Sequence, residues 1–238
     1  MIFSHIADFE AALHESIAPD EAAIDQARER QAQLTKPAGS LGRLEDIAIF
    51  FAGWQGRAIP RIDRARAVIF AGNHGVTARG VSAFPAEVTA QMVGNFRAGG
   101  AAINALAGAA GLDLRIVALD LDRPTADFTI APAMTEAECL TALSAGADSV
   151  DSSLDLLVLG EMGIGNSTAA AALCARSLGG DGASWAGPGT GVDDAGIGRK
   201  IAVVDSALVF HSDAPATAFE TLRRVGGREI AAMAGAVL

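Results

Sequence analysis

The chain has 238 residues, of which 50% are hydrophobic and 19% charged, and its formal net charge is −10. This composition is typical of a globular protein with a sizeable core rather than of a disordered one. The negative charge disfavours nucleic acid as a partner, because surfaces that bind it are basic. No apolar run approaches the ~20 residues that cross a bilayer, so we expect no membrane partner.

The first residues, "MIFSHIADFEAALHESI", interrupt their apolar positions with Asp8, Glu10 and Glu15, which predicts an amphipathic helix rather than a signal peptide. The two cysteines, Cys139 and Cys174, show no CxxC spacing. We therefore expect buried, unpaired thiols in a cytoplasmic protein. The histidines lack metal-ligand spacing, so no metal or other cofactor is expected.

Hydrophobic periodicity and turn residues divide the rest of the chain into alternating helices and short strands. Helices are predicted within residues 20–34, 44–54, 85–111, 135–150, 166–178, 193–211, 214–227 and 228–238. Strands are predicted around residues 68–70, 112–121 and 153–163. The helical stretch after Pro85 should divide at Gly99–Gly100, and Thr135 with Glu138 forms a capping-box pattern.

Short strands that alternate with helices predict an α/β fold, with a largely parallel β-sheet flanked by helices in a Rossmann-like three-layer arrangement. We expect an N-terminal helical segment (1–60) appended to one α/β domain (61–238). The glycine-rich loops at 71–84 and 160–168 both follow strands. They should therefore open on the same sheet edge, where α/β proteins bind ligands.

The last stretch, "REIAAMAGAVL", is apolar and helical, with no stop signal or polar tail after it. The sequence looks cut short here. We expect an exposed apolar helix face that promotes association, and hence a homodimer.

The stretch "GEMGIGNSTAAAALCA" (160–175) places glycines and an Asn-Ser-Thr triplet directly before an alanine-rich helix. Such a corner is either an anion cradle of helix-start amides or a tight turn with a Ser/Thr cap. The sequence contains no P-loop, GxGxxG, GxSxG or HExxH motif. The absence of these motifs disfavours a P-loop NTPase, a dinucleotide-binding protein, an α/β-hydrolase and a metalloprotease.

Four blocks resemble the signature segments of the nicotinate-nucleotide–dimethylbenzimidazole phosphoribosyltransferase family. They are "KPAGSLGRLE" (36–45), "AGNHGVTARGVSAFPAEVTAQMVGNFRAGGAAIN" (71–104), "GEMGIGNST" (160–168) and "GPGTGVDDAGIGRK" (187–200). The resemblance runs in one order from about residue 20 to the last residue. It implies transfer of phosphoribose from nicotinate mononucleotide to 5,6-dimethylbenzimidazole, which gives α-ribazole 5′-phosphate and nicotinate in the assembly of the cobalamin lower ligand.

Under this resemblance, a phosphate is held by the helix-start corner, by a second glycine-rich cradle and by one lysine. The residues implied are Gly163, Gly165, Asn166, Ser167, Thr168, Gly189, Thr190, Gly191 and Lys200. Without the resemblance, Lys200 would be interpreted as a solvated helix lysine. Asp193 and Asp194 open the same helix and are interpreted as caps.

Glu161 would be repelled by phosphate, so it is a candidate partner of a ribose hydroxyl or a ring nitrogen, or else an exposed turn carboxylate. The resemblance implies that Ser82 and Gln91 bond the azole edge, although a turn hydroxyl and an exposed amide would explain them equally. Nearby Phe84 and Met92 would contact the ring or belong to the core. His74 is either a structural histidine or a catalytic one.

The family's general base is a glutamate in a glycine-rich segment near the C-terminus, and no such segment follows Gly227 in this sequence. We therefore assign no catalytic residue from the resemblance. The alternative function is a truncated, non-catalytic form that still binds the nucleotide or the benzimidazole.

Overall fold

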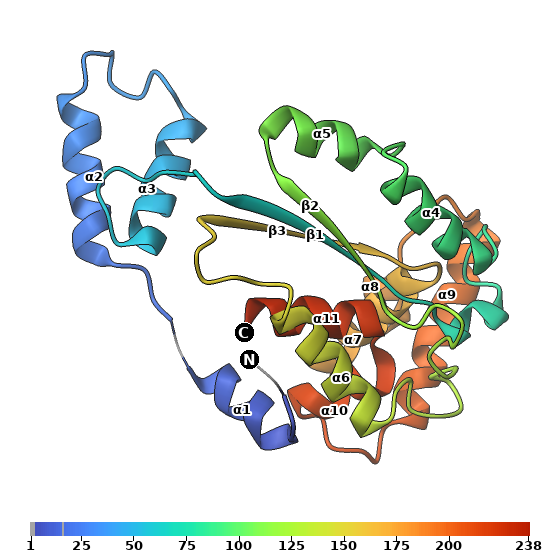
Figure 1. Ribbon diagram of the computed structural model, residues 1–238. Helices are drawn as coiled ribbons and strands as arrows, with labels where there is room; N and C mark the ends of the chain where they lie inside the picture. The colour runs from blue at the N-terminus through green and yellow to red at the C-terminus, as the bar shows by residue number, and fades with distance from the viewer. Residues whose placement is uncertain (1–2, 16) are drawn as a thin grey trace.

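The computed structural model describes residues 3–15 and 17–238 (Figure 1). Three parallel strands form its sheet in the order β2-β1-β3: β1 (Ala65–Ala71), β2 (Asp113–Ala118) and β3 (Leu156–Met162). Ala71, the last residue of β1, is in register with Ala118 and with Met162. The three strands thus end at one edge, which confirms the α/β fold and the expected position of both glycine-rich loops.

Helices cover both faces of the sheet (Figure 1). On one side lie α4 (Glu87–Arg97) and α5 (Ala102–Ala110), which separate at Gly99–Gly100 as the sequence predicts. On the other side lie α6 (Glu136–Ala147) and α11 (Arg228–Val237). Side chains of β1 and α11 form a small core between the layers: Val68, Phe70, Ala232 and Ala236. The layers are helix, sheet and helix.

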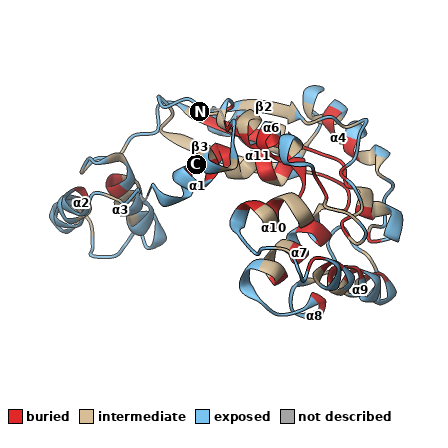
Figure 2. Cartoon of the chain, turned by 90° about the horizontal axis from the view of Figure 1, so that it is seen from below, coloured by how far each residue is buried: buried red, intermediate tan, exposed pale blue. Residues whose placement is uncertain are grey.

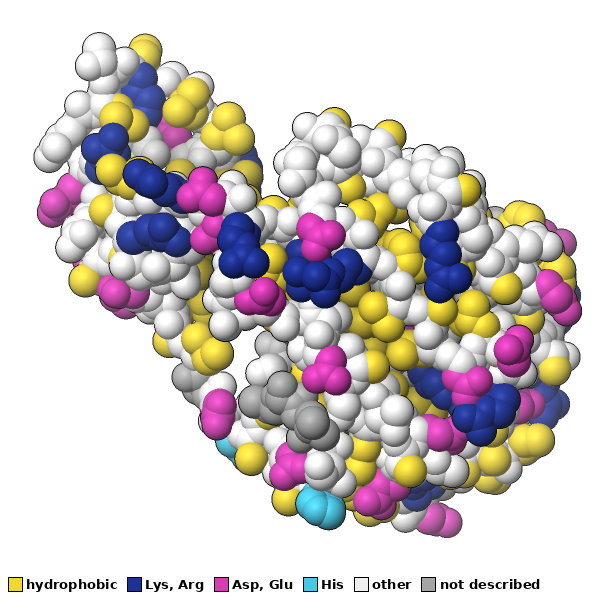
Figure 3. All heavy atoms as spheres, viewed as in Figure 1, with side chains coloured by type: hydrophobic (Ala, Val, Ile, Leu, Met, Phe, Trp, Pro, Cys, Tyr) yellow, Lys and Arg dark blue, Asp and Glu magenta, His cyan; other side chains and the backbone are white. Residues whose placement is uncertain are grey.

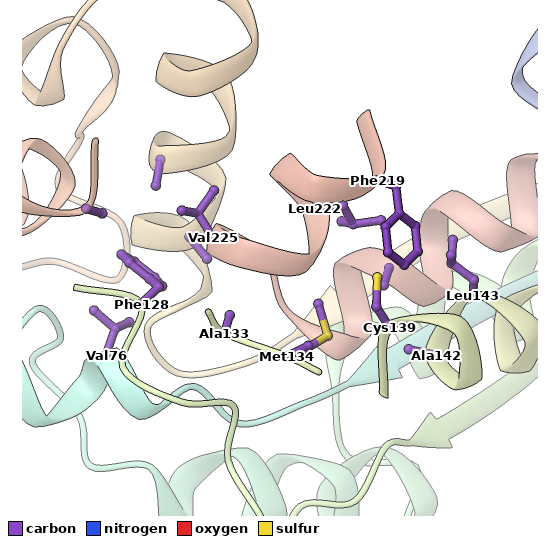
Figure 4. Close-up of a cluster of buried hydrophobic side chains, with 14 of the residues drawn as sticks. Val76, Phe128, Ala133, Met134, Cys139, Ala142, Leu143, Phe219, Leu222 and Val225 are labelled. Carbon is purple, nitrogen blue, oxygen red and sulfur yellow. The ribbon is translucent and has the colours of Figure 1, made fainter. Parts of the chain in front are cut away.

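A second group of helices lies beyond the strand ends. It contains α7 (Asn166–Leu178), α8 (Gly182–Trp185), α9 (Asp194–Phe210) and α10 (Ala218–Val225). The short 3₁₀ helix η1 (Gly75–Arg79) follows β1. The larger core joins these elements to α6, and Figure 4 shows Val76, Phe128, Leu143 and Phe219 pointing into it. This core holds the functional loops on a packed base.

The N-terminal helices differ in whether they pack against the main body. The first, α1 (Ile6–His14), docks on the main body, where the rings of Phe9 and Phe219 meet edge to face at 5.8 Å. The second pair, α2 (Glu21–Gln33) and α3 (Arg43–Gln55), forms an antiparallel hairpin that stands away from the sheet (Figures 1 and 2). A Cβ added at Gly53 would lie 2.7 Å from the Ile24 side chain, so the two helices pack closely.

The expectation of an exposed apolar face on the last helix is wrong. Added Cβ atoms at Gly146 and Gly235 would lie 1.7 Å from the carbonyl oxygen of Ala232 and 1.9 Å from that of Leu143. Because glycine occupies both positions, α6 and α11 approach backbone to backbone, and α11 is largely buried (Figure 2).

Exposed apolar side chains instead form a stripe on α3, within the lobe at the upper left of Figure 3. Its members, spaced three or four residues apart, are Leu44, Ile47, Phe50 and Trp54. Such a spacing places the side chains on one face of a helix. The hairpin therefore carries an exposed apolar face, whereas α11 is largely buried.

The structure bears on several local expectations. The Thr135 hydroxyl accepts a hydrogen bond from the Glu138 amide at 3.2 Å and begins α6. Cys139 is buried and unpaired, and burial raises the pKa of its thiol to about 12, whereas Cys174 is unpaired but only half-buried and so departs from the expectation. Within residues 3–15 and 17–238, no helix is both long and apolar enough to cross a membrane.

Candidate functional site

The strand-end edge brings together loops from distant parts of the sequence. Residues 72–74 follow β1, residues 163–165 follow β3, and the loop 187–192 precedes α9. The Gly72 amide donates to the Met162 carbonyl at 3.0 Å, and the Ile164 amide donates to the Thr89 hydroxyl at 3.1 Å. These bonds fix the β3–α7 corner against β1 and α4.

Lys200 is a buried cation at this edge. It lies in the second turn of α9, which Asp193 caps by accepting from the Gly196 amide at 2.8 Å. Its side chain is only 1% exposed, and its ammonium donates to the Ser167 hydroxyl at 2.9 Å and the Gly187 carbonyl at 2.7 Å. Burial lowers the pKa of Lys200, and no carboxylate among the described residues offsets this effect. A buried ammonium held by two neutral oxygens has capacity for an anion.

The two predicted phosphate cradles meet at this lysine. Gly189 has a φ of +54°, and a Cβ there would lie 2.8 Å from the Ser167 Oγ and 3.0 Å from the Lys200 Nζ. The backbone of the 187–191 loop thus reaches the ammonium only because residue 189 has no side chain. The structure brings Ser167, Gly189 and Lys200 into one corner, while Thr190 and Gly191 lie exposed on the adjoining loop. The alternative of a solvated lysine is wrong.

Some of the backbone amides at the start of α7 are already hydrogen-bonded within the corner. Asn166 and Thr168 already donate their amides to Gly163 and Gly165, each at 3.0 Å. Gly165 has a φ of +92°, and a Cβ there would lie 2.8 Å from the Thr77 side chain. Thr168 is fully buried, with a hydroxyl that has no hydrogen-bond partner among the described residues. Contacts of Gly163, Gly165, Asn166 and Thr168 with an anion stay predictions. The absence of a side chain at Gly165 also allows the corner to pack against Thr77.

Glu161 lies next to this corner, near the end of β3, and accepts a close hydrogen bond from the Asn166 amide group. Its pKa is raised, chiefly because neighbouring groups exclude water from part of its carboxyl and further because of the negative charge of Glu229. Asn166 and His74 act in the opposite direction. Its carboxyl thus points toward the corner that holds Ser167, and it has an acid–base character unlike that of an ordinary surface glutamate.

The sequence did not identify Glu229, which pairs with His74. The His74 Nε2 and the Glu229 Oε1 lie 2.6 Å apart, and both side chains are 0% exposed. Glu229 is in the first turn of α11, within a run interpreted only as apolar. The available signal was a glutamate within a run of apolar residues on a predicted helix. Because charged side chains are almost never buried without a partner, Glu229 could have been expected to pair with another polar group.

The ring side of the edge is more open. The Ser82 hydroxyl accepts from the Phe84 amide at 3.2 Å, Gln91 is exposed on α4, and Phe84 is 49% exposed. Met92 is half-buried. The Arg199 guanidinium donates to the Gly80 carbonyl at 3.1 Å and so joins this loop to the helix of Lys200. Roles of Ser82 and Gln91 in binding a ring stay predictions.

A sheet edge with a buried lysine and glycine-rich anion loops is typical of enzymes that act on phosphorylated nucleotides, and the comparisons agree. A family model described as phosphoribosyltransferase matches residues 17–238. A solved structure from Thermus thermophilus, titled a dimethylbenzimidazole phosphoribosyltransferase, superposes with a TM-score of 0.82 at 39% identity, over 91% of this chain and 70% of that one.

Two curated relatives carry the name nicotinate-nucleotide–dimethylbenzimidazole phosphoribosyltransferase. The protein of Novosphingobium aromaticivorans is 73% identical over 236 residues, which are 99% of this chain and 70% of the relative. That of Ruegeria pomeroyi is 58% identical over 232 residues, or 98% and 68%. The chain belongs to the nicotinate-nucleotide–dimethylbenzimidazole phosphoribosyltransferase family.

Proposed function

We propose that this protein transfers phosphoribose from nicotinate mononucleotide to 5,6-dimethylbenzimidazole, giving α-ribazole 5′-phosphate and nicotinate for the cobalamin lower ligand. The observation that carries the proposal is the buried Lys200, whose ammonium contacts Ser167 and Gly187 and no carboxylate among the described residues. In a chain with a net charge of −10, a local cation in a glycine-lined corner is what a nucleotide phosphate requires.

The reaction is a displacement at C1′ of the ribose. The pyridinium nitrogen of the nucleotide is cationic, so its departure neutralises it, and nicotinate leaves without a metal. The azole nitrogen attacks from the opposite face and inverts the anomeric centre. The protein must align the two rings and provide a group that accepts the proton of the azole.

Two groups of residues divide the binding and alignment of the substrates, and the acceptor of the azole proton is left unassigned. Lys200, Ser167 and the amides of Gly189 and Thr190 hold the phosphate, because Ser167 accepts from the lysine and keeps its own proton free to donate. Glu161 faces the ribose, where its carboxylate bonds a hydroxyl. Ser82 and Gln91 bond the azole edge.

A transfer assay tests the proposal directly. The purified protein is mixed with nicotinate mononucleotide and dimethylbenzimidazole, and both products are separated by chromatography. We expect nicotinate and α-ribazole 5′-phosphate in equal amounts, and neither product without the benzimidazole. Binding of both ligands in calorimetry with no product would support the alternative, a non-catalytic binding form. No binding of either ligand would contradict both functions.

Matched substitutions assign the two half-sites. Ser82→Ala and Gln91→Ala should each weaken the affinity for dimethylbenzimidazole by about fivefold, the value of one neutral hydrogen bond, and leave nucleotide affinity unchanged. Equal losses for both ligands would contradict this assignment.

We further propose a cytoplasmic homodimer of chains divided into segments 1–60 and 61–238. The unpaired cysteines support a reducing compartment, and the exposed stripe on α3 supports association. Light scattering should give twice the chain mass for the native protein and one chain mass for Phe50→Glu. Phe50 is 59% exposed, so this change leaves the core intact.

A further inference from the structure

The buried pair of His74 and Glu229 has no part in the chemistry described so far. It joins residues 155 positions apart in sequence. Among the described residues, the His74 Nδ1 and the Glu229 Oε2 have no hydrogen-bond partner. Buried polar atoms are nearly always paired, and a buried ion pair adds little stability over apolar side chains of the same volume. Stability alone therefore does not explain why the pair is present.

Three glycines approach the pair closely, and at Gly72 and Gly227 an added Cβ would overlap it. A Cβ at Gly72 would lie 2.6 Å from the Glu229 Oε2, one at Gly163 would lie 3.1 Å from the His74 Nε2, and one at Gly227 would lie 2.3 Å from the His74 Cε1. None of the three glycines has a left-handed backbone. Space for the pair, and not backbone conformation, requires glycine at positions 72 and 227, while at Gly163 an added Cβ would first meet the Gly72 carbonyl oxygen at 2.6 Å.

The pair lies against the base of the candidate site. Gly163 is two residues from Glu161, and both Glu229 and His74 act on the Glu161 carboxyl through their charges. Glu161 is faced by His74 from the loop after β1, by Glu229 from α11 and by the neutral Asn166 from α7. Arg228, the neighbour of Glu229, turns to Glu138 at 2.6 Å. Glu229 itself lies in the first turn of α11.

We propose that His74 and Glu229 act together as positioning residues, which hold the β3–α7 corner so that Glu161 and Ser167 face the bound nucleotide. The proposal rests on the function proposed above. Through His74, Glu229 ties the loop after β1 to the start of α11, and Gly163 packs the β3–α7 corner against that tie. The two members of the pair also act on the pKa of the Glu161 carboxyl in opposite directions, since Glu229 raises it and His74 lowers it.

The Glu229→Gln variant tests the proposal, because it keeps the shape of the side chain and removes its charge. We expect kcat to fall at least about tenfold, since small misplacements of reacting groups are costly. The KM for nicotinate mononucleotide should change less, because Lys200 keeps its contacts. The titration of the Glu161 carboxyl carbon, followed by NMR, should move to lower pH because a repelling negative charge has been removed.

A second variant and a control separate positioning from folding. Gly72→Ala presses on the Glu229 carboxylate without removing a charge and should lower kcat with little change in the Glu161 titration. Glu138→Gln breaks the pair with Arg228, one residue from Glu229 on α11. It should lower the melting temperature and leave kcat and the Glu161 titration as in the native protein.

The outcomes distinguish this inference from the proposed function. A native protein that makes no product contradicts the proposed function, and the Glu161 titration then decides alone: a shift in Glu229→Gln supports the coupling, and no shift overturns it. In an active native protein, a Glu229→Gln variant with native kcat and a lowered melting temperature overturns the proposal, because that is the result of a structural role.

Discussion

The phosphate side and the ring side of the strand-end edge differ in how far they are assembled. On the phosphate side, Lys200 is buried and bonded to two loops, and Gly189 closes the corner. On the ring side, Ser82 bonds only its own turn, while Gln91 and Phe84 are exposed. A preorganised corner binds its ligand with little loss of conformational entropy, whereas an open side must order its side chains on binding. We therefore expect most of the affinity and the pH dependence to reside on the phosphate side.

The largest effect should come from Lys200→Met, which keeps the length of the side chain and removes its charge. Affinity for nicotinate mononucleotide should fall about 100-fold, the value of a charged hydrogen bond. Affinity for free dimethylbenzimidazole should not change, because that ligand carries no phosphate. The free energy of unfolding should stay the same or increase, since a buried ammonium without a carboxylate partner is costly.

Calorimetry with both ligands and a denaturant titration measure these three quantities. The matched control is Lys36→Met, which removes the chain's other lysine, paired with Glu45 at 2.7 Å. It should leave nucleotide affinity as in the native protein. If Lys200→Met weakened both ligands alike, the division of the edge into two sides would be wrong.

The pH dependence of nucleotide binding should be the next largest effect. Burial lowers the pKa of Lys200 from its ordinary value of 10.5, so its charge is lost at a lower pH than that of an exposed lysine. Above that pKa, affinity for the nucleotide should fall by up to about tenfold per pH unit, the limit for one proton. In Lys200→Met this alkaline decline should be absent.

The same shift has the opposite sign for folding. Because the unfolded chain binds the Lys200 proton more tightly, protonated Lys200 destabilises the native state below its folded pKa. That cost is relieved as the pH rises from the folded pKa toward 10.5. At alkaline pH, loss of the Lys200 charge should therefore lower nucleotide affinity and increase the contribution of this residue to the free energy of unfolding. Nucleotide affinity and the free energy of unfolding are each measured against pH, the second by denaturant titration. If both declined with the same midpoint pH, the cause would be general alkaline unfolding instead.

Gly189→Ala should weaken nucleotide affinity by about tenfold, because the new Cβ meets the Ser167 Oγ and the Lys200 Nζ. It should also cost about 1 kcal/mol of stability, since φ is +54°. Gly99→Ala is the matched control: its φ is +80°, and nothing lies within 4 Å of the added Cβ. That variant should show the stability cost alone. Native affinity in Gly189→Ala would mean that the loop does not close the corner when the nucleotide binds.

The same contrast explains what the sequence could and could not predict. Local patterns identified the three strands, the capping box at Thr135 and the glycine-rich loops, because each depends on neighbours in sequence. The meeting of Ser167 with Lys200 was implied only by the family resemblance, because the segment that carries Lys200 follows a helix and not a strand. The partner of His74 did not follow, because Glu229 is brought to it only by the packing of α11.

The burial of α11 was missed for a related reason. Its partner is the backbone of α6, reached through Gly146 and Gly235, and small residues leave no hydrophobic pattern that marks a contact. On the ring side, Gln91 is exposed, and Ser82 is half-buried with its hydroxyl bonded to the nearby Phe84 amide. Here neither the local sequence nor the packing fixes a role, and only a ligand would do so.

The smallest effect concerns the contact that joins the two sides. Arg199 donates to the Gly80 carbonyl at 3.1 Å from the helix that carries Lys200, and Gly80 begins the loop of Ser82. Because the bond is exposed, Arg199→Ala should cost little by itself, with each ligand binding alone within about twofold of the native affinity.

The bond should matter for cooperation between the two ligands. Nucleotide bound at Lys200 restrains α9 and, through Arg199, the ring-side loop. Dimethylbenzimidazole affinity measured with and without saturating nucleotide gives the coupling, which should be favourable in the native protein and reduced in Arg199→Ala. An unchanged coupling would show that the two sides communicate by another route, or only through the ligands themselves.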